Sequence, residues 1–129
     1  MRHTISIGFV VFLVSFTAFG PAFAATPTSL QEKLAENGFT LGTEAQAITD
    51  YRLDDRVYLD SRHFILPENS SRSYLVTLDK KCHGLYANKL FLRTRTRYQL
   101  VPRDVVRPQH QGRNLDRCEV VSIHQLVPR

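Results

Sequence analysis

The N-terminal 24 residues constrain the fold of this 129-residue chain most, because they resemble a secretory signal peptide that is removed. Arg2 and His3 give a charged start, Ile5 to Phe19 form an apolar run, and Ala22-Phe23-Ala24 matches a signal-peptidase site. A membrane-spanning helix needs about 20 predominantly apolar residues, and this run is shorter. We therefore expect an exported chain, periplasmic or secreted, with no stable membrane span after cleavage. Retention of the segment as an anchor remains the alternative.

The mature chain, residues 25–129, has a length that fits a single domain. Residues 25–44 are predicted to be a tail and a short helix, and residues 45–129 a single β-rich domain. Ser29 and Glu32 match a capping box, and Asn37-Gly38 supplies a helix stop, so a helix is expected at about 30–37. Residues 39–50 are ambiguous, because they can form a second short helix or start a strand at Ile48.

From Val57 onward the apolar period changes toward two, which is typical of strands. Strands are predicted at 57–59, 63–66, 73–78, 90–98, 100–106 and 118–126, with 73–78 pairing back on 63–66 and a polar loop at 107–117. The predicted fold class is α+β, mainly antiparallel β. We expect a small single sheet or partial barrel, with one or two short N-terminal helices and one disulfide.

The two cysteines, Cys82 and Cys118, both lie in the mature part of the chain. In an oxidising compartment, a lone pair in a small domain favours a disulfide. Such a bond would stabilise the fold by roughly 4 kcal/mol in the chain-entropy model. The alternative is a thiol or metal site with the adjacent His83, but the chain lacks the paired close spacing typical of structural zinc sites. We predict no metal and no cofactor.

Charge is unevenly divided along the mature chain, and two interpretations stay open. Residues 25–79, the acidic half, carry 5 basic and 9 acidic side chains, whereas residues 80–129, the basic half, carry 11 basic and 3 acidic ones. The halves can attract each other in the fold, or the basic half can present a surface to polyanions.

The segment Arg93-Thr94-Arg95-Thr96-Arg97 is the strongest binding candidate. Strand alternation would place the guanidiniums of Arg93, Arg95 and Arg97 on one face, about 6 to 7 Å apart. Guanidinium groups suit phosphate and carboxylate oxygens, so the expected partner is an anionic envelope component or an envelope protein. The alternative is a solvated face paired with carboxylates of the acidic half, and such exposed pairs are individually weak.

The stretch Tyr74-Leu75-Val76-Thr77-Leu78, the following Cys82 and the closing Cys118 to Ile123 resemble a family of small exported Gram-negative proteins. That family is catalogued only as a domain of unknown function, and the likeness covers about residues 45–126. The resemblance implies a cell-envelope location, a single small domain and no assigned activity, so no site residue is carried over from it.

No catalytic constellation is recognisable, and an enzymatic activity is therefore not our leading hypothesis. His63, His83 and His110 can supply acid-base groups only if the fold gathers them in a pocket, and His124 in its apolar strand is expected to be a satisfied structural histidine. Nucleic acid is not an expected partner, because nucleic-acid-binding motifs are missing. We predict a non-enzymatic envelope protein of unknown process and oligomeric state. The alternatives are a small secreted hydrolase, a hydrolase inhibitor or a metal-handling protein.

Overall fold

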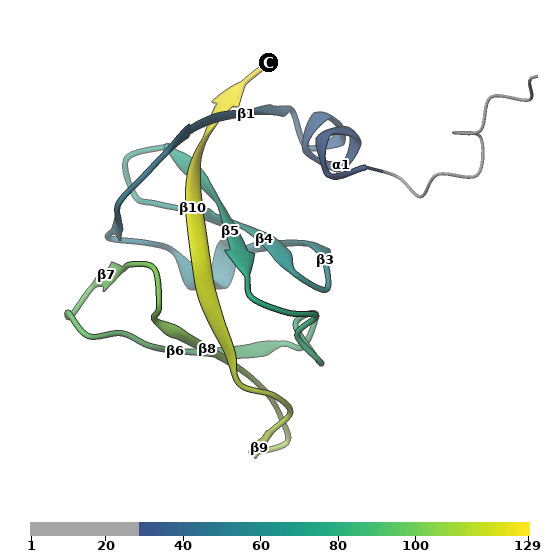
Figure 1. The fold of residues 1–129 in the computed structure, drawn as a ribbon, viewed down its shortest axis with the longest axis vertical. Coiled ribbons are helices and arrows are strands. Elements are labelled where there is room, and N and C mark those ends of the chain that lie inside the picture. Colours follow the sequence, from purple (N-terminus) through teal and green to yellow (C-terminus); the bar gives the residue numbers. More distant parts are fainter. Residues whose placement is uncertain (1–28) are drawn as a thin grey trace, which may run out of the picture.

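A computed structural model describes residues 29–129, and the predicted signal peptide, residues 1–24, lies outside the described residues. The structure is built around its longest strand, β10, which runs the length of the molecule (Figure 1). In chain order, the elements are α1 (Leu30–Glu36), β1 (Phe39–Glu44), β2 (Ile48–Thr49), the 3-10 helix η2 (Leu53–Asp55), β3 (Val57–Asp60), β4 (His63–Pro67), β5 (Ser73–Leu78), β6 (Lys89–Arg93), β7 (Gln99–Leu100), β8 (Val105–His110), β9 (Arg113–Asn114) and β10 (Cys118–Pro128).

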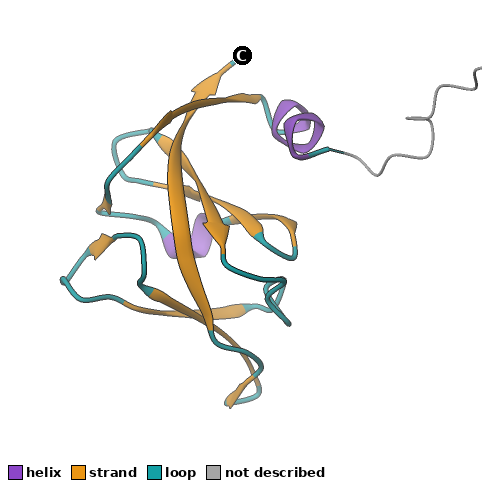
Figure 2. Ribbon diagram, in the orientation of Figure 1, coloured by secondary structure: helices purple, strands orange, loops and turns teal. Residues whose placement is uncertain are grey.

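The strand β10 joins two parts of one curled sheet. One side of β10 pairs with β5, whereas its other side pairs with β8 near the N-terminal end and with β1 near the C-terminal end. The sheet order is β3-β4-β5-β10-β8-β6, and β2 and β7 form a small separate sheet. Every pairing is antiparallel, and the sheet curls into a half-barrel (Figure 2). The predicted fold class, mainly antiparallel β with a disulfide, is confirmed.

Two hydrophobic clusters lie on opposite faces of the sheet. The inner cluster includes Phe64, Val76 and Ile123 and fills the curl of the half-barrel. The outer cluster includes Ile65 and Leu75 and is covered by α1 and its neighbourhood. Because consecutive residues of β4 and β5 face different clusters, these strands are buried on both faces and show continuous burial rather than strict alternation.

The helix α1 follows its sequence signals. The Oγ atom of Ser29 accepts a hydrogen bond from the amide of Glu32 at 3.2 Å, and the chain leaves the helix through Gly38 at φ 85°. The helix predicted at 30–37 is therefore confirmed. Within residues 29–129, no helix is long and apolar enough to cross a membrane.

Strand β1 lies in the segment where the sequence left two possibilities open. Its partly buried positions recur every three residues rather than every two, so the alternation that predicts a strand is missing there. β1 approaches β10 closely, since a Cβ at Gly42 would lie 2.8 Å from the carbonyl oxygen of Gln125. The second helix considered for residues 39–50 does not form, because this stretch holds β1 and β2.

The polar loop predicted at 107–117 is wrong in part, because most of it is a hairpin. β8 extends to His110 and returns as β9 through Gln111 and Gly112, both at positive φ, which is the pattern of a two-residue hairpin turn. Pro108 is tolerated inside β8 because it lies where β8 changes partner from β10 to β9. The carbonyl oxygen of Pro108 accepts a hydrogen bond from the amide of Leu115 at 2.8 Å, while its ring nitrogen donates none.

Candidate functional site

The three candidate arginines lie on two elements rather than one. We predicted a single strand over residues 90–98, but β6 ends at Arg93. The chain leaves the sheet because the amide of Arg95 donates to Oδ1 of Asp104 at 3.3 Å instead of to a neighbouring strand. Arg97 then lies in a turn. All three arginines are exposed, but the alternation of exposure ends at Arg95, because Thr96 and Tyr98 are exposed as well.

Asp104 fixes the backbone of this segment, and sequence reasoning missed it. Its side chain is almost completely buried, and its second oxygen accepts the amide of Val101 at 2.8 Å. A buried carboxylate is costly unless it is hydrogen-bonded, and two backbone donors meet that need. Burial raises the pKa of Tyr51, and the Asp104 carboxylate adds to that shift. The sequence gives no signal for this role of Asp104, because the folded chain alone brings the amides of Arg95 and Val101 to its carboxylate.

The turn that follows β6 presents an aromatic side chain at its tip. The amide of Gln99 donates to the carbonyl oxygen of Thr96 at 3.3 Å, which closes a four-residue turn. Its third residue, Tyr98, has φ 63° and is 67% exposed. The Cζ atom of Arg97 lies 5.9 Å from the centroid of the Tyr98 ring, within cation–π range. The tip therefore combines a cation and an aromatic ring in one contact.

A second aromatic side chain lies among the basic residues of β6. Phe91 is 52% exposed, shares the outer face of β6 with Lys89 and Arg93, and lies opposite Arg107 of β8. Residues paired in this way point to the same face of the sheet. We define the basic face by its members from β6, the turn and β8: Lys89, Phe91, Arg93, Arg95, Arg97, Tyr98 and Arg107.

The guanidinium groups of the basic face form no ion pair with a carboxylate among residues 29–129. Three ion pairs occur in this part of the chain, Arg52–Asp55, Asp60–His63 and Lys80–Asp116. Each joins residues of the same half, so in the described structure no ion pair links the acidic half to the basic half. The positive charge of Arg93, Arg95 and Arg97 thus stays available at the surface.

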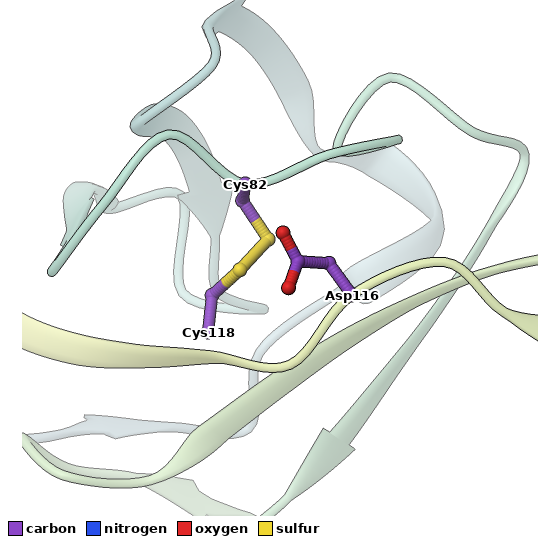
Figure 3. A group of neighbouring side chains, drawn as sticks. All are labelled: Cys82, Asp116 and Cys118. Atoms are coloured by element: carbon purple, nitrogen blue, oxygen red, sulfur yellow. A yellow bond between two sulfur atoms is a disulfide. The ribbon is translucent and has the colours of Figure 1, made fainter.

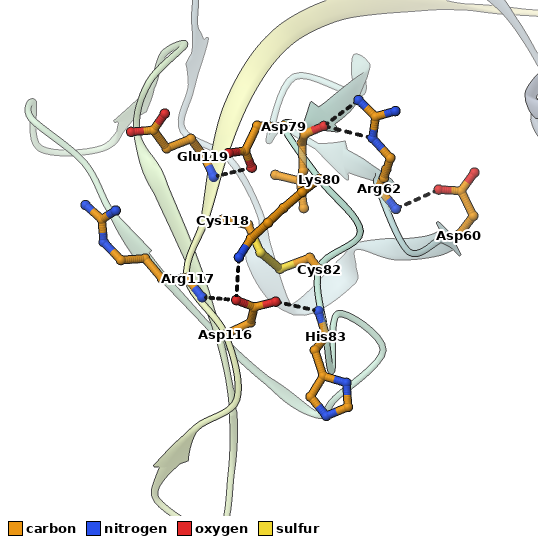
Figure 4. Close-up of a disulfide and its surroundings, with 11 residues drawn as sticks. Asp60, Arg62, Asp79, Lys80, Cys82, His83, Asp116, Arg117, Cys118 and Glu119 are labelled. Atoms are coloured by element: carbon orange, nitrogen blue, oxygen red, sulfur yellow. Dashed lines mark hydrogen bonds and ion pairs between the residues drawn. A yellow bond between two sulfur atoms is a disulfide. The ribbon is translucent and has the colours of Figure 1, made fainter.

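The disulfide predicted from the sequence joins Cys82 to Cys118, with their Cα atoms 6.0 Å apart. Both cysteines are buried, and the bond ties the corner after β5 to the start of β10 (Figure 3). Asp116 stands beside the bond and reinforces the same junction (Figure 4). Its carboxylate accepts hydrogen bonds from the Lys80 ammonium at 2.9 Å and from the His83 amide at 2.9 Å. These bonds lower the pKa of Asp116 to about 2.

Cys82, Asp116 and Cys118 bring ligand-type atoms within 4.8 Å of one another. Because the two sulfur atoms are bonded to each other, the group presents no thiolate to a metal ion. The carboxylate is also occupied by Lys80 and by backbone amides. The geometry fits a structural junction and does not fit a metal centre.

The loop from Cys82 to Asn88 is held at several points and displays Tyr86. The Arg56 guanidinium donates to the carbonyl oxygens of Ala87 at 2.7 Å and Asn88 at 3.1 Å. Burial lowers the pKa of Arg56, the Asp54 carboxylate opposes that shift, and the group remains a cation. Tyr86 is 72% exposed, and its ring meets that of Tyr58 edge-on, with centroids 6.1 Å apart.

Two of the histidines considered for acid-base chemistry line one hollow beside this loop. His83 and His110 border a depression of about 340 Å³, together with Tyr86, Ala87, Asn88 and Leu115. This lining, drawn from the part of the chain that the structure describes, includes no carboxylate. The hollow offers aromatic and imidazole groups without the acid partner that orients a catalytic histidine.

The other histidines lie elsewhere. The Nδ1 atom of His63 is 2.8 Å from Oδ1 of Asp60 at the turn between β3 and β4. Burial alone would raise the pKa of Asp60, but hydrogen bonds from Arg62 and His63 and the nearby Lys33 outweigh it, so the pKa is lowered. The expectation that His124 is satisfied is wrong, because its buried Nδ1 atom has no hydrogen-bond partner among residues 29–129.

The comparisons with known proteins give a family and no activity. A family model described as "Family of unknown function (DUF6491)" matches residues 1–129. The chain belongs to this family. The resemblance noted in the sequence, to a domain of unknown function, is thereby confirmed. No curated protein and no solved structure matches the chain.

Proposed function

We propose that this chain is a non-enzymatic exported protein that binds an anionic component of the cell envelope through the basic face. The observation that supports this proposal is that Arg93, Arg95 and Arg97 are all exposed and that none of their guanidinium groups forms an ion pair among residues 29–129. An ion-paired face would have its charge neutralised, whereas this one keeps three guanidinium forks for phosphate or carboxylate oxygens.

The backbone under these arginines is fixed before any ligand arrives. Asp104 holds the amides of Arg95 and Val101, and the turn at Thr96 is closed by its own hydrogen bond. A preorganised segment loses less conformational entropy on binding than a flexible one. This arrangement supports a contact surface rather than an incidental cluster of charge. Export is supported by the signal-peptide pattern predicted at residues 1–24, and the disulfide is compatible with it.

The test compares two triple variants with the same change in net charge. R93E/R95E/R97E reverses the basic face, and R113E/R117E/R129E reverses three other exposed arginines of the same half. Each cation near an anionic surface contributes about 1 kcal/mol, so removing three weakens binding by at least about 100-fold. We expect that loss on anionic vesicles or cell-wall material for the first variant and a much smaller one for the second. Equal losses, or no binding by the wild type, would refute the proposal.

A small hydrolase is a second candidate, and one observation favours it. His83 and His110 line the same hollow, which is the gathering that an enzyme would require. A panel of chromogenic esters and phosphodiesters tests this candidate with the wild type and an H83N/H110N variant. Turnover that the double variant abolishes would support the enzyme, and turnover that survives it would remove the hollow as the active site.

A further inference from the structure

The basic face contains two large apolar rings that a purely electrostatic site does not need. Phe91 is 52% exposed between Lys89 and Arg93 on the outer face of β6, and Tyr98 is 67% exposed at the tip of the following turn. A soluble polyanion gains little from an exposed phenyl ring. A membrane interface accommodates aromatic rings at headgroup level and attracts basic residues to anionic lipids.

Tyr98 occupies a backbone position that does not suit it. Positive φ at the third residue of a four-residue turn, with Arg97 at ordinary φ, is the pattern that favours Gly or Asn. An aromatic residue there is a conformational outlier, and such strain persists where another requirement keeps the residue. Tyr98 is mostly exposed, so burial in the core is not that requirement.

We infer that the anionic component is a lipid surface. The rings of Phe91 and Tyr98 enter the interfacial region, while Arg93, Arg95 and Arg97 contact headgroup phosphates. This inference rests on the proposed function and names the ligand class of the same face. It is supported by the charge, which complements an anionic leaflet, and by the two rings, which find an apolar region in a bilayer interface but none in a soluble phosphate polymer.

A tryptophan reporter tests insertion directly, because the chain contains no tryptophan of its own. Phe91→Trp places one fluorophore on the basic face. Leu41→Trp is the matched control, since Leu41 is 45% exposed on β1 and pairs with Leu126, about 25 Å along β10 from the β8 end. With vesicles of phosphatidylethanolamine and phosphatidylglycerol, we expect a blue shift and quenching by brominated lipid for Phe91→Trp alone. Unchanged Phe91→Trp emission on vesicles that bind the protein overturns the inference.

A second measurement separates the lipid from other polyanions. The F91S/Y98N variant keeps every arginine and gives the turn a residue that tolerates positive φ. We expect its affinity for the vesicles to fall at least tenfold and its affinity for soluble polyphosphate to stay within twofold of the wild type. Equal effects on both ligands, or no effect on vesicle binding, overturn the inference.

The failures of the two proposals give different results. If the wild type binds polyphosphate but not vesicles, and R93E/R95E/R97E abolishes that binding, the lipid inference fails and the proposed function stands. If R93E/R95E/R97E binds vesicles as tightly as the wild type does, the proposed function fails, and the lipid inference fails with it. Capture of an acidic protein by the basic face without vesicle binding likewise removes the lipid.

Discussion

Reduction of the Cys82–Cys118 disulfide should destabilise the protein mainly by freeing its unfolded state. The two cysteines are 36 residues apart, and closing a loop of that length stabilises a fold by roughly 4 kcal/mol in the chain-entropy model. Domains of this size have a total stability of about 5–15 kcal/mol. Each kilocalorie shifts the melting temperature by about 4–8 °C, so we expect a fall of about 15–30 °C.

The native loop should survive reduction, because other contacts hold it. Arg56 still binds the carbonyl oxygens of Ala87 and Asn88, and Asp116 still binds the amide of His83. We therefore expect an unchanged far-ultraviolet circular dichroism spectrum without denaturant. The same hydrogen bonds predict that the amide of His83 stays protected from hydrogen exchange in the reduced protein.

The assay is urea unfolding of the oxidised protein, the reduced protein and a C82A/C118A variant. With a slope of about 2 kcal/mol per molar urea, a loss of 4 kcal/mol lowers the midpoint by about 2 M. The variant should lose a further 1 kcal/mol or so, since both sulfur atoms are buried and alanine leaves space behind. A midpoint shift below about 0.5 M on reduction, or a rearranged native spectrum, would refute the loop-closure reasoning.

Three further changes have expected signs. Tyr98→Gly should raise the free energy of unfolding, measured by urea titration, by about 0.5–1 kcal/mol. The gain is expected because relief of the positive φ is worth more than the lost cation–π contact with Arg97. Vesicle binding should weaken in the same variant, and a loss of stability would contradict this prediction. Asp104→Asn should lower the free energy of unfolding by about 1–3 kcal/mol, because the new amide nitrogen cannot accept the hydrogen bond that a carboxylate oxygen accepted. Hydrogen exchange should become faster at the amide of Arg95 or Val101. If both amides stay protected in the variant, Asp104 does not hold this backbone. The pKa of Asp116 is lowered to about 2, so its contribution is present above pH 4 and lost as the pH falls toward 2. After allowance for solvent screening this is about 1 kcal/mol, and Asp116→Asn should remove that part of the pH dependence.

The capped helix and the strands β3, β4, β5 and β10 were predictable because their signals are local. The Ser29 hydroxyl caps the helix by accepting the Glu32 amide, and the run from Ser73 to Leu78 is rich in β-branched and aromatic residues. The end of β6 was not predictable in this way. It depends on Asp104, which lies nine residues after Arg95 and acts only when the chain folds back on itself.

The sequence by itself determined the residue chemistry: an excess of arginines after residue 80, two cysteines suited to a disulfide, and strand periodicity over most of the chain. Only the tertiary structure decided which charges are compensated, because ion pairing depends on distances between segments that the sequence does not order. It also left the rings of Phe91 and Tyr98 exposed beside the arginines and brought His83 and His110 to one hollow. These positions follow from the long-range pairing of β8 with β6 and β10, since side-chain neighbours across a sheet are set by register rather than by position along the chain.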